Sequence, residues 1–320
     1  MKAIRIHEAG GPDVLRYEEV PEPKPGPGEV LIDLVAAGIN FSDIGSRRRG
    51  DAATRPYTPG SEGAGSIVSI GAGVTDLRIG ELVACQGAAG CYADMVAAPV
   101  ESVAKMPAGI AAEDAAAAML QGRTAYAMAF QAYQTKPGDR LLIHAAAGGV
   151  GLLLTQMAKQ AGAYVFATVG NDDKVDIARE AGADSVINYS REDFTAAVNK
   201  ETGGEGVNAI FDSVGNATFV KGLECLASRG YMISYGQASG PIEPFDLSLL
   251  SRSGGYVTRT NAKRYGPTLE GWRFQVSEVF AWIKSGRLKI RRTSYPLAQA
   301  AGAHRDLEGR RTTGKLLLIP

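Results

Sequence analysis

Short apolar runs alternate with helical segments in the second half of the chain, starting at Arg140. Strands that are apolar throughout, with helices between them, are typical of a parallel sheet buried on both faces. The expected strands are Leu141–His144, Tyr164–Thr168, Ser185–Ile187, Ala209–Asp212 and Gly230–Ser234, and the expected helices are Val150–Ala161, Lys174–Ala181 and one near Phe219–Ala227. The pattern predicts an α/β fold with a doubly wound parallel sheet.

The first third of the chain has short strands separated by glycine and proline, and this spacing indicates a small, partly open β-barrel. The strands expected there are Lys2–Ile6, Val30–Ala36, Gly63–Gly71 and Glu81–Cys85. Alanine-rich segments at Ala111–Leu120 and Thr124–Tyr133 favour helices. Near the end, Glu270–Ser285 is expected to form an amphipathic helix, and Lys315–Ile319 a strand that returns to the N-terminal domain.

Length and charge narrow the classes of function. A chain of 320 residues fits two domains of ordinary size, and 45% apolar with 21% charged residues is a normal globular composition. The 34 Lys and Arg residues balance 34 Asp and Glu, so no basic excess favours nucleic acid or a membrane surface. The densest positive cluster, Arg47 to Arg49, is expected in a solvated loop; the alternative is that it attracts an anionic cofactor or substrate.

The N-terminal segment and the cysteines bear on location. No cationic leader with an apolar stretch follows Met1, so no signal peptide is expected. Leu141–Ala158 carries no formal charge, but glycines divide it into a strand and a helix, which argues against a membrane span. Cys85, Cys91 and Cys225 form neither a CxxC pair nor a disulfide framework. We therefore expect a cytoplasmic protein.

The strongest motif is the turn after the first strand of the parallel sheet. Residues Ala146 to Gly151 have the form A-x-G-x-x-G of a dinucleotide-binding fingerprint, with alanine at the first glycine position. Gly148 would let the backbone approach a pyrophosphate, and Gly151 would let the helix pack closely on the strand. The free N–H groups at the start of the helix favour phosphates. Because an apolar strand precedes the motif and an apolar helix follows it, we predict a bound dinucleotide.

The end of the second strand indicates which dinucleotide binds. NAD enzymes usually end this strand with an acid that binds the ribose hydroxyls, whereas here it ends at Val169 and Gly170 without one. Asp172 and Asp173 are interpreted as cap and first-turn residues of the next helix. Lys174, in that first turn, is within reach of a 2′-phosphate; its alternative is a solvated helix residue. NADPH is the predicted cofactor.

A set of segments in order along nearly the whole chain resembles the motifs of one family, the zinc-independent quinone oxidoreductases and zeta-crystallins of the medium-chain dehydrogenase/reductase superfamily. The segments are His7–Leu15, Gly38–Asp43, Pro59–Gly65, His144–Gly151, Val186–Tyr189, Phe211–Gly215 and Thr313–Pro320. The resemblance implies a GroES-like β-barrel domain, residues 1–122 and 262–320, with a Rossmann dinucleotide-binding domain, residues 123–261, inserted between its parts. Because family members are commonly dimers, a homodimer is expected.

The resemblance also implies site residues. Asn40 is the candidate catalytic residue, expected beside the nicotinamide, where its amide would hydrogen-bond the cofactor or an acceptor carbonyl. Lys174, Tyr189 and Arg311 are expected to surround the adenosine phosphate or pyrophosphate end. Taken alone, each polar residue is also consistent with a cap or a loop. The full cofactor-binding set is Asn40, Thr124, Gly148, Gly149, Val150, Gly170, Lys174, Tyr189, Ser213, Gly236, Gln237 and Arg311.

The metal positions of related enzymes are changed in this chain. In the alcohol dehydrogenases of the superfamily, a zinc-ligand cysteine falls at Asn40 and a ligand histidine at Ser61, and neither residue here is a normal zinc ligand. The four-cysteine structural lobe is missing, so no metal site is expected. Without a Lewis acid, the easiest chemistry is hydride delivery to an acceptor that is already electrophilic, such as a quinone.

Three functions stay open at this point. The first is NADPH-dependent quinone reduction, and the second is reduction of an activated C=C bond in an enal, enone or enoyl thioester. The third is a dinucleotide-binding structural or RNA-associated protein, against which the neutral charge and the intact motif argue. Some relatives carry tyrosines, one a proton donor in enoyl-thioester reductases, at positions occupied here by Gly45 and Asp51. The absence of these tyrosines favours quinone reduction over C=C reduction. Tyr57 lies nearby in the sequence but is offset from their positions, and either Tyr57 or water is an alternative source of the proton.

Overall fold

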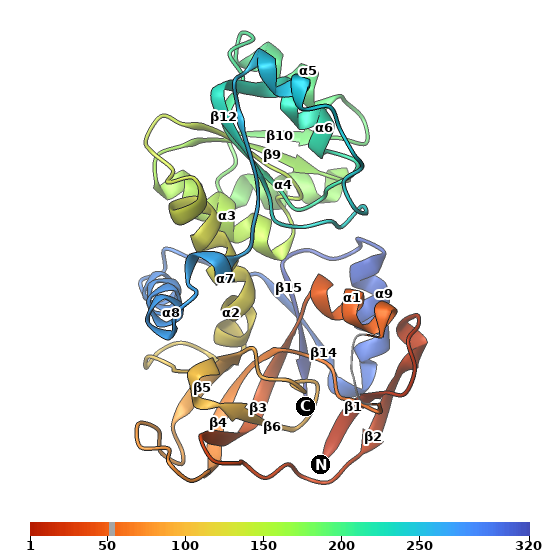
Figure 1. Cartoon of the computed structure of the whole chain (residues 1–320), viewed down its shortest axis with the longest axis vertical. Coiled ribbons are helices and arrows are strands. Elements are labelled where there is room, and N and C mark those ends of the chain that lie inside the picture. Colours follow the sequence, from red (N-terminus) through yellow and green to blue (C-terminus); the bar gives the residue numbers. More distant parts are fainter. Residues whose placement is uncertain (51–54) are drawn as a thin grey trace. The chain divides into compact units, whose positions relative to one another are not determined.

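The computed structural model describes residues 1–50 and 55–320. The chain separates into two compact units, one of Met1–Leu120 with Val276–Pro320 and the other of Gln121–Gln275. Each unit has a main β-sheet, as Figure 1 shows. Each also has a hydrophobic core of its own.

The first unit is built on a seven-stranded sheet. Its strands in spatial order are β14 (Arg292–Pro296), β15 (Lys315–Ile319), β3 (Glu29–Ile39), β4 (Glu62–Ile70), β5 (Leu82–Gln86) and β7 (Val103–Lys105), with β6 (Met95–Pro99) also paired to β3. β15 runs antiparallel to β3, with Leu316 opposite Ile39 (Figure 1). The predicted return of the last strand to the N-terminal domain is confirmed, and it brings residues near 40 and near 315 together.

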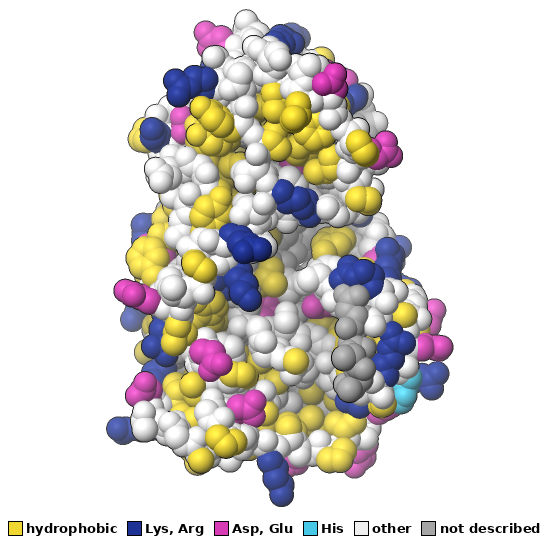
Figure 2. Space-filling view, viewed as in Figure 1, with side chains coloured by type: hydrophobic (Ala, Val, Ile, Leu, Met, Phe, Trp, Pro, Cys, Tyr) yellow, Lys and Arg dark blue, Asp and Glu magenta, His cyan; other side chains and the backbone are white. Residues whose placement is uncertain are grey.

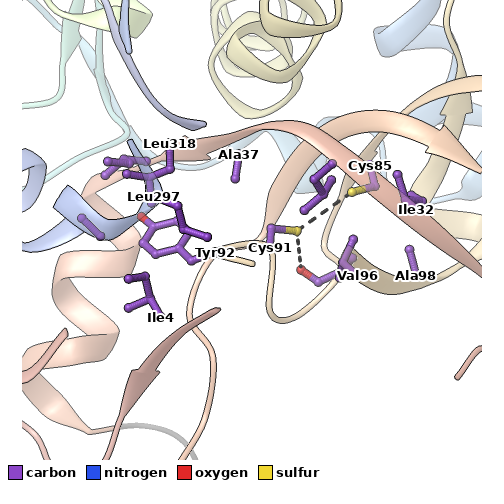
Figure 3. Close-up of a cluster of buried hydrophobic side chains, with 14 of the residues drawn as sticks. Ile4, Ile32, Ala37, Cys85, Cys91, Tyr92, Val96, Ala98, Leu297 and Leu318 are labelled. Carbon is purple, nitrogen blue, oxygen red and sulfur yellow. Dashed lines mark hydrogen bonds between the residues drawn. The ribbon is translucent and has the colours of Figure 1, made fainter. Parts of the chain in front are cut away.

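Alternating side chains build the core of this unit. In β3, Ile32 and Leu34 are buried, whereas Asp33 between them is exposed to solvent. A hairpin of β1 (Lys2–Ile6) and β2 (Leu15–Glu19) adds Ile4 to the same cluster. Figure 3 shows Tyr92 in this core, where its ring is buried among aliphatic side chains. The sheet and this buried hydrophobic cluster agree with the predicted barrel domain.

The second unit is a parallel sheet, as the apolar strand pattern predicts. Every neighbouring pair of its strands is parallel. The spatial order is β10 (Ser185–Asn188), β9 (Tyr164–Val169), β8 (Arg140–Ile143), β11 (Val207–Asp212), β12 (Leu226–Ser234) and β13 (Tyr256–Arg259). The helices between strands are α3 (Gly149–Gln160), α4 (Val175–Glu180), α5 (Phe194–Glu201) and α6 (Phe219–Gly222). This order, with the first strand in the middle, is that of a doubly wound Rossmann sheet.

The helices before and after this sheet differ in part from the prediction. Two helices were expected between residues 111 and 133, but α2 (Ala112–Tyr126) is continuous and passes into a π-helical stretch at Ala127–Ala132. Gly122 inside α2 is buried, and its packing offsets the weak helix propensity that glycine brings. The expected amphipathic helix is α8 (Leu269–Lys284), preceded by α7 (Ala262–Tyr265). Among the described residues, no helix combines the length and apolar character that crossing a bilayer requires.

The solvated loop predicted for the arginine cluster is wrong for Arg47. Residues Phe41–Arg49 form helix α1, and Arg47 is 0% exposed. Its Nε donates to the Gly10 carbonyl at 3.1 Å, and its guanidinium pairs with Glu308 at the end of α9 (Ala300–Glu308). Arg48, one position on, is the exposed residue that the prediction describes, although it too pairs with Glu308. The sequence did not reveal the burial because the partners of Arg47 lie in distant segments.

Candidate functional site

The glycine-rich turn joins β8 to α3. Gly148 is the N-cap of α3 and has extended backbone, so the first N–H groups of the helix have no intrahelical acceptor. A Cβ on Gly151 would lie 2.4 Å from the carbonyl oxygen of Ala145, which leaves no room for a side chain. A Cβ on Gly148 would meet only that same oxygen, at 3.1 Å. The turn therefore packs the helix closely on the strand and leaves the side of Gly148 open.

Most of the expected cofactor residues follow strand ends of the parallel sheet. Because all strands point the same way, the segments after them meet at one edge, where ligands bind in such folds. Residues after β8 are Gly148, Gly149 and Val150; after β9, Gly170 and Lys174; after β10, Tyr189; after β11, Ser213; and after β12, Gly236 and Gln237. The structure thus brings these residues to one edge of the second unit. Thr124 lies in the last part of α2, from Gln121 onward, which belongs to the same unit.

The turn after β9 is where the 2′-phosphate of NADPH is expected. The Tyr189 hydroxyl lies 2.9 Å from the place of a Gly170 Cβ, and the Ser190 hydroxyl donates to the Gly170 carbonyl at 2.8 Å. Lys174 ends a 3₁₀ turn and is the N-cap residue of α4. Tyr189, from the segment after β10, therefore lies against the backbone of Gly170, four residues before Lys174.

Asp172 is an acid in this same turn. Its carboxylate accepts a hydrogen bond from the Asn188 amide at 2.7 Å and pairs with Arg191. Asp172 and Asp173 lie in the first turn, as interpreted from the sequence, but the N-cap is Asn171. The cationic partner of Asp172 offsets a negative charge that would otherwise oppose a phosphate here. Arg191 was not among the expected site residues.

The loops after β11 and β12 contact each other. The Ser213 carbonyl accepts from the N–H of Ala238 at 3.1 Å, and a Cβ on Gly236 would lie 2.6 Å from that carbonyl oxygen. Asp212, which is fully buried, accepts from the N–H of Val214 at 2.7 Å and fixes the start of the loop. Close contact between the loops therefore requires glycine at position 236.

His144 follows β8 but belongs to the core. It is 0% exposed, its Nδ1 shares a hydrogen bond of 3.0 Å with the Thr168 hydroxyl, and its ring meets Phe194 edge-on. Burial lowers the pKa of His144 to about 4, so the ring is neutral at pH 7. We interpret His144 as a packing residue that supports the turn.

Asn40, in the first unit, links β3 to α1 and is 4% exposed. Its Nδ2 donates to Glu62 Oε1 at 2.6 Å, and its Oδ1 accepts from Lys315 Nζ at 2.7 Å. Its backbone N–H donates to Asp43 Oδ2 at 2.8 Å. The side-chain amide of this candidate catalytic residue is therefore held by Glu62 and Lys315, and its backbone N–H by Asp43, all within its own unit. Glu62 and Lys315 were not singled out from the sequence.

Asp43 begins a buried hydrogen-bonded chain. Tyr92 donates to Asp43 Oδ2 at 3.0 Å and lies 3.1 Å from His304 Nε2, while Arg47 lies 2.8 Å from His304 Nδ1. The guanidinium can only donate, so Nδ1 of His304 accepts and Nε2 carries the hydrogen that Tyr92 accepts. Burial, and then the Arg47 charge, lower the pKa of His304 to about 3. Burial raises the pKa of Asp43 to about 6, although Asn40, Lys315 and Tyr92 favour its ionised form.

The remaining positions named from the sequence are placed as follows. Ser61 precedes β4, and no group of three or more His, Cys, Asp or Glu within residues 1–50 and 55–320 is arranged to hold a metal. Gly45 lies in α1, Asp51 lies outside the described residues, and Tyr57 packs against the barrel core. Arg311 follows α9 and is engaged by Asp306, with an Nη2 to Oδ1 distance of 2.7 Å.

Comparisons with known proteins agree with both units. Residues 26–108 match the alcohol dehydrogenase GroES-like domain, and residues 149–270 match the family described as zinc-binding dehydrogenase. A GroES-like domain joined to this Rossmann sheet defines a medium-chain dehydrogenase/reductase.

Full-length relatives narrow the class. A quinone oxidoreductase from Pseudomonas aeruginosa is 38% identical, with 100% of this chain and 99% of the relative covered. A 2-haloacrylate reductase from Burkholderia is 37% identical, with coverage of 99% and 98%. The crystal structure of Escherichia coli quinone oxidoreductase complexed with NADPH matches over 100% of both chains, with a TM-score of 0.96 and 38% identity. The chain belongs to the quinone oxidoreductase family.

Proposed function

We propose that this chain reduces quinones with NADPH as the hydride donor and without a metal. The observation that carries the proposal is the full-length similarity to quinone oxidoreductases, one of which was crystallised with NADPH. The absence of an acid at the tip of β9 and the presence of Lys174 beyond it support NADPH over NADH. Asn40 and Ser61, at the positions of zinc ligands in related alcohol dehydrogenases, support the metal-free chemistry.

The residues of the second unit fit this cofactor. The open side of Gly148 and the free N–H groups at the start of α3 would hold the pyrophosphate. Lys174 and Tyr189 would hold the 2′-phosphate beside Gly170, where the side chain is absent and the Tyr189 hydroxyl takes its place. The remaining members of the expected set, Thr124, Gly149, Val150, Ser213, Gly236, Gln237, Arg311 and Asn40, are proposed to line the rest of the dinucleotide.

The bound cofactor supplies the hydride, so the protein has to position the acceptor and keep out water. Asn40 is the residue we assign to positioning at the reacting end, because its second Nδ2 hydrogen is not used by Glu62. An amide N–H that donates to an acceptor carbonyl would stabilise the charge that develops on oxygen during hydride transfer.

A panel of acceptors tests the proposal. We expect NADPH oxidation to be fastest with an ortho-quinone or a para-quinone, slower with an enal or an enoyl thioester, and poor with NADH in place of NADPH. Zinc analysis of the purified protein is the parallel check. A preference for the enal or the thioester, or a full equivalent of zinc, would contradict the assignment.

Reduction of an activated C=C bond is the second candidate. Its support is the similarity to a 2-haloacrylate reductase over nearly the whole of both chains. The acceptor panel separates the two functions, because the scaffold and the hydride donor are the same in both and only the acceptor differs.

Replacement of Lys174 by alanine tests the phosphate assignment. Loss of one charge-assisted contact is expected to weaken NADPH binding about 10- to 100-fold and to leave NADH binding nearly unchanged, since only NADPH carries the extra phosphate. Titration of each cofactor against the variant measures both constants. Lys200→Ala, which removes an exposed lysine of α5, is the matched control. Equal losses for the two cofactors would refute the assignment.

We also propose a homodimer that forms at β13. This strand ends the order of the parallel sheet, and it pairs on one side with β12. Its residues Tyr256 and Val257 are exposed, as are Leu247 and Leu249 just before it. An edge strand with exposed apolar side chains favours pairing with a second copy.

Val257→Lys is expected to convert this dimer to a monomer, because both copies would carry a charge at the shared edge. Light scattering after size exclusion should then give 33.6 kDa instead of about twice that mass. Val68→Lys, at an exposed valine of β4, should stay dimeric. A wild-type protein that is monomeric at micromolar concentration would rule the dimer out.

The remaining expectations concern location and domain limits. We propose a cytoplasmic location, supported by three buried free cysteines.

Acidic and basic side chains are both spread over the face in Figure 2, which supports the expectation of no nucleic-acid or membrane partner. We keep residues 1–122 with 262–320 and residues 123–261 as the proposed limits of the substrate and cofactor domains.

A further inference from the structure

Lys315 is a buried lysine in an apolar strand. It opens β15, is 1% exposed, and is followed by Leu316 and Leu317, which are buried as well. Its Nζ donates to Glu62 Oε1 and, at 2.7 Å, to Asn40 Oδ1. A buried ammonium requires partners of this kind, because burial removes its hydration. One partner of Lys315 is the candidate catalytic amide itself, and the other, Glu62, binds the NH₂ end of that amide.

Glu62 is fixed at both of its oxygens. It is 0% exposed, and Oε2 accepts from the backbone N–H of Leu120 at 2.6 Å, while Oε1 accepts from Asn40 Nδ2. The opposing strand leaves space for it only at a glycine, since a Cβ on Gly38 would lie 2.4 Å from Oε1. The carboxylate therefore has one position and presents one oxygen to both Asn40 and Lys315.

These contacts decide which way the Asn40 amide faces. The two ends of an amide have nearly the same shape, so only hydrogen bonding distinguishes them. With Lys315 at one end and Glu62 at the other, one orientation satisfies every group. The flipped orientation would place the NH₂ against the ammonium and the carbonyl against the carboxylate, and both contacts are repulsive.

We propose that Lys315 is a positioning residue for hydride transfer, which together with Glu62 keeps the Asn40 NH₂ as the donor toward the reacting groups. The inference rests on the proposed function. It adds two residues to the site that lie 253 positions apart in sequence and form a buried pair. Their charges orient Asn40 and do not contact the substrate.

A double variant, Lys315→Met with Glu62→Gln, tests the inference without leaving a lone buried charge. The Leu120 N–H still needs an acceptor, so the glutamine introduced at position 62 turns its carbonyl to that N–H and its NH₂ to Asn40. Asn40 then flips to offer its oxygen. We expect single-turnover hydride transfer from NADPH to a quinone to fall about 10- to 100-fold, with the NADPH dissociation constant changed less than about twofold.

Three further variants test positioning separately from folding. In an Asn40→Ala background, the Lys315→Met/Glu62→Gln change should reduce hydride transfer no further, because its effect passes through Asn40. Ile67→Ala, a core truncation in β4, should lower the melting temperature and leave the rate per folded site unchanged. Gly38→Ala, which displaces the Glu62 carboxylate, should behave like the double variant.

Hydride transfer in the double variant within about twofold of wild type would overturn the inference and leave the proposed function intact; so would an effect that multiplies with Asn40→Ala. If the wild-type protein fails to oxidise NADPH with any of the quinones tested, the proposed function is overturned instead. In that case, ¹⁵N spectra of the Asn40 side chain still test the orientation. We expect the NH₂ hydrogens of Asn40 to exchange slowly with solvent in the wild type and fast in the double variant. Equal exchange in the two proteins would show that Glu62 and Lys315 do not hold the Asn40 side chain.

Discussion

Replacement of Arg47 by methionine is expected to lower the free energy of unfolding of the first unit by about 3–5 kcal/mol. The guanidinium is 0% exposed, and its removal leaves the buried Nδ1 of His304 and the half-buried Gly10 carbonyl without this donor. Each unsatisfied acceptor costs about 1–3 kcal/mol, and methionine fills most of the volume, so the lost hydrogen bonds dominate. Denaturant titration monitored by fluorescence measures the change.

Arg48→Met is the matched control for this prediction. Arg48 pairs with the same Glu308 carboxylate, but its side chain is 61% exposed. An exposed ion pair contributes less than about 1 kcal/mol, so this variant should unfold near wild type. Similar losses for the two variants would show that Arg47 acts as a surface charge and that its burial has no energetic consequence.

The second large effect is expected at the glycine turn. Gly151→Ala places a methyl group 2.4 Å from the Ala145 carbonyl oxygen and 2.7 Å from the Ala146 Cα, both of them backbone atoms that cannot move aside cheaply. We expect the free energy of unfolding to fall by about 2–3 kcal/mol and NADPH binding to be lost with it, since helix α3 must move away from β8.

Gly148→Ala separates binding from stability at the same turn. Its added methyl group meets only the Ala145 oxygen, at 3.1 Å, so we expect a loss of stability below about 1 kcal/mol. The methyl group stands on the open side where a pyrophosphate would approach, so NADPH binding should weaken more than about tenfold. Calorimetric titration and thermal unfolding of the two variants give the comparison. Unimpaired NADPH binding by Gly148→Ala would mean that the cofactor does not approach this turn.

The parallel sheet could be predicted because its signal is local. Leu141, Leu142 and Ile143 are buried on both faces of the sheet, so the strand is apolar without interruption, and Gly148 and Gly149 mark where the next helix begins. Helix α5 was not among the expected helices, although an N-cap residue in the sequence indicates where it begins. The Asp193 side chain accepts hydrogen bonds from the backbone N–H groups of Thr195 and Ala196. Residues that follow such strands could therefore be assigned to one edge of the sheet from the sequence alone.

The first unit was less predictable because its polar core depends on contacts between distant segments. Helix α1 contains Gly45 and three consecutive arginines and shows no apolar stripe, so a loop was the natural interpretation. The burial of Arg47 depends on α9, more than two hundred residues later. The Lys315 pair had one local sign, a single charge at the start of an apolar strand, but its partner could not be read from that strand.

The position of β15 also bears on how the protein emerges from the ribosome. The second unit is contiguous, so all of its strands have been synthesised before Val276 appears, and we expect it to fold during translation. The first unit cannot finish at that stage, because β3 still lacks its neighbour β15. Until residue 319 has left the exit tunnel, the nascent chain carries a folded Rossmann sheet and an incomplete barrel. In that interval Glu62 has no ammonium beside it, and the end of β3 at residues 37–39 lacks the strand that pairs with it in the finished unit.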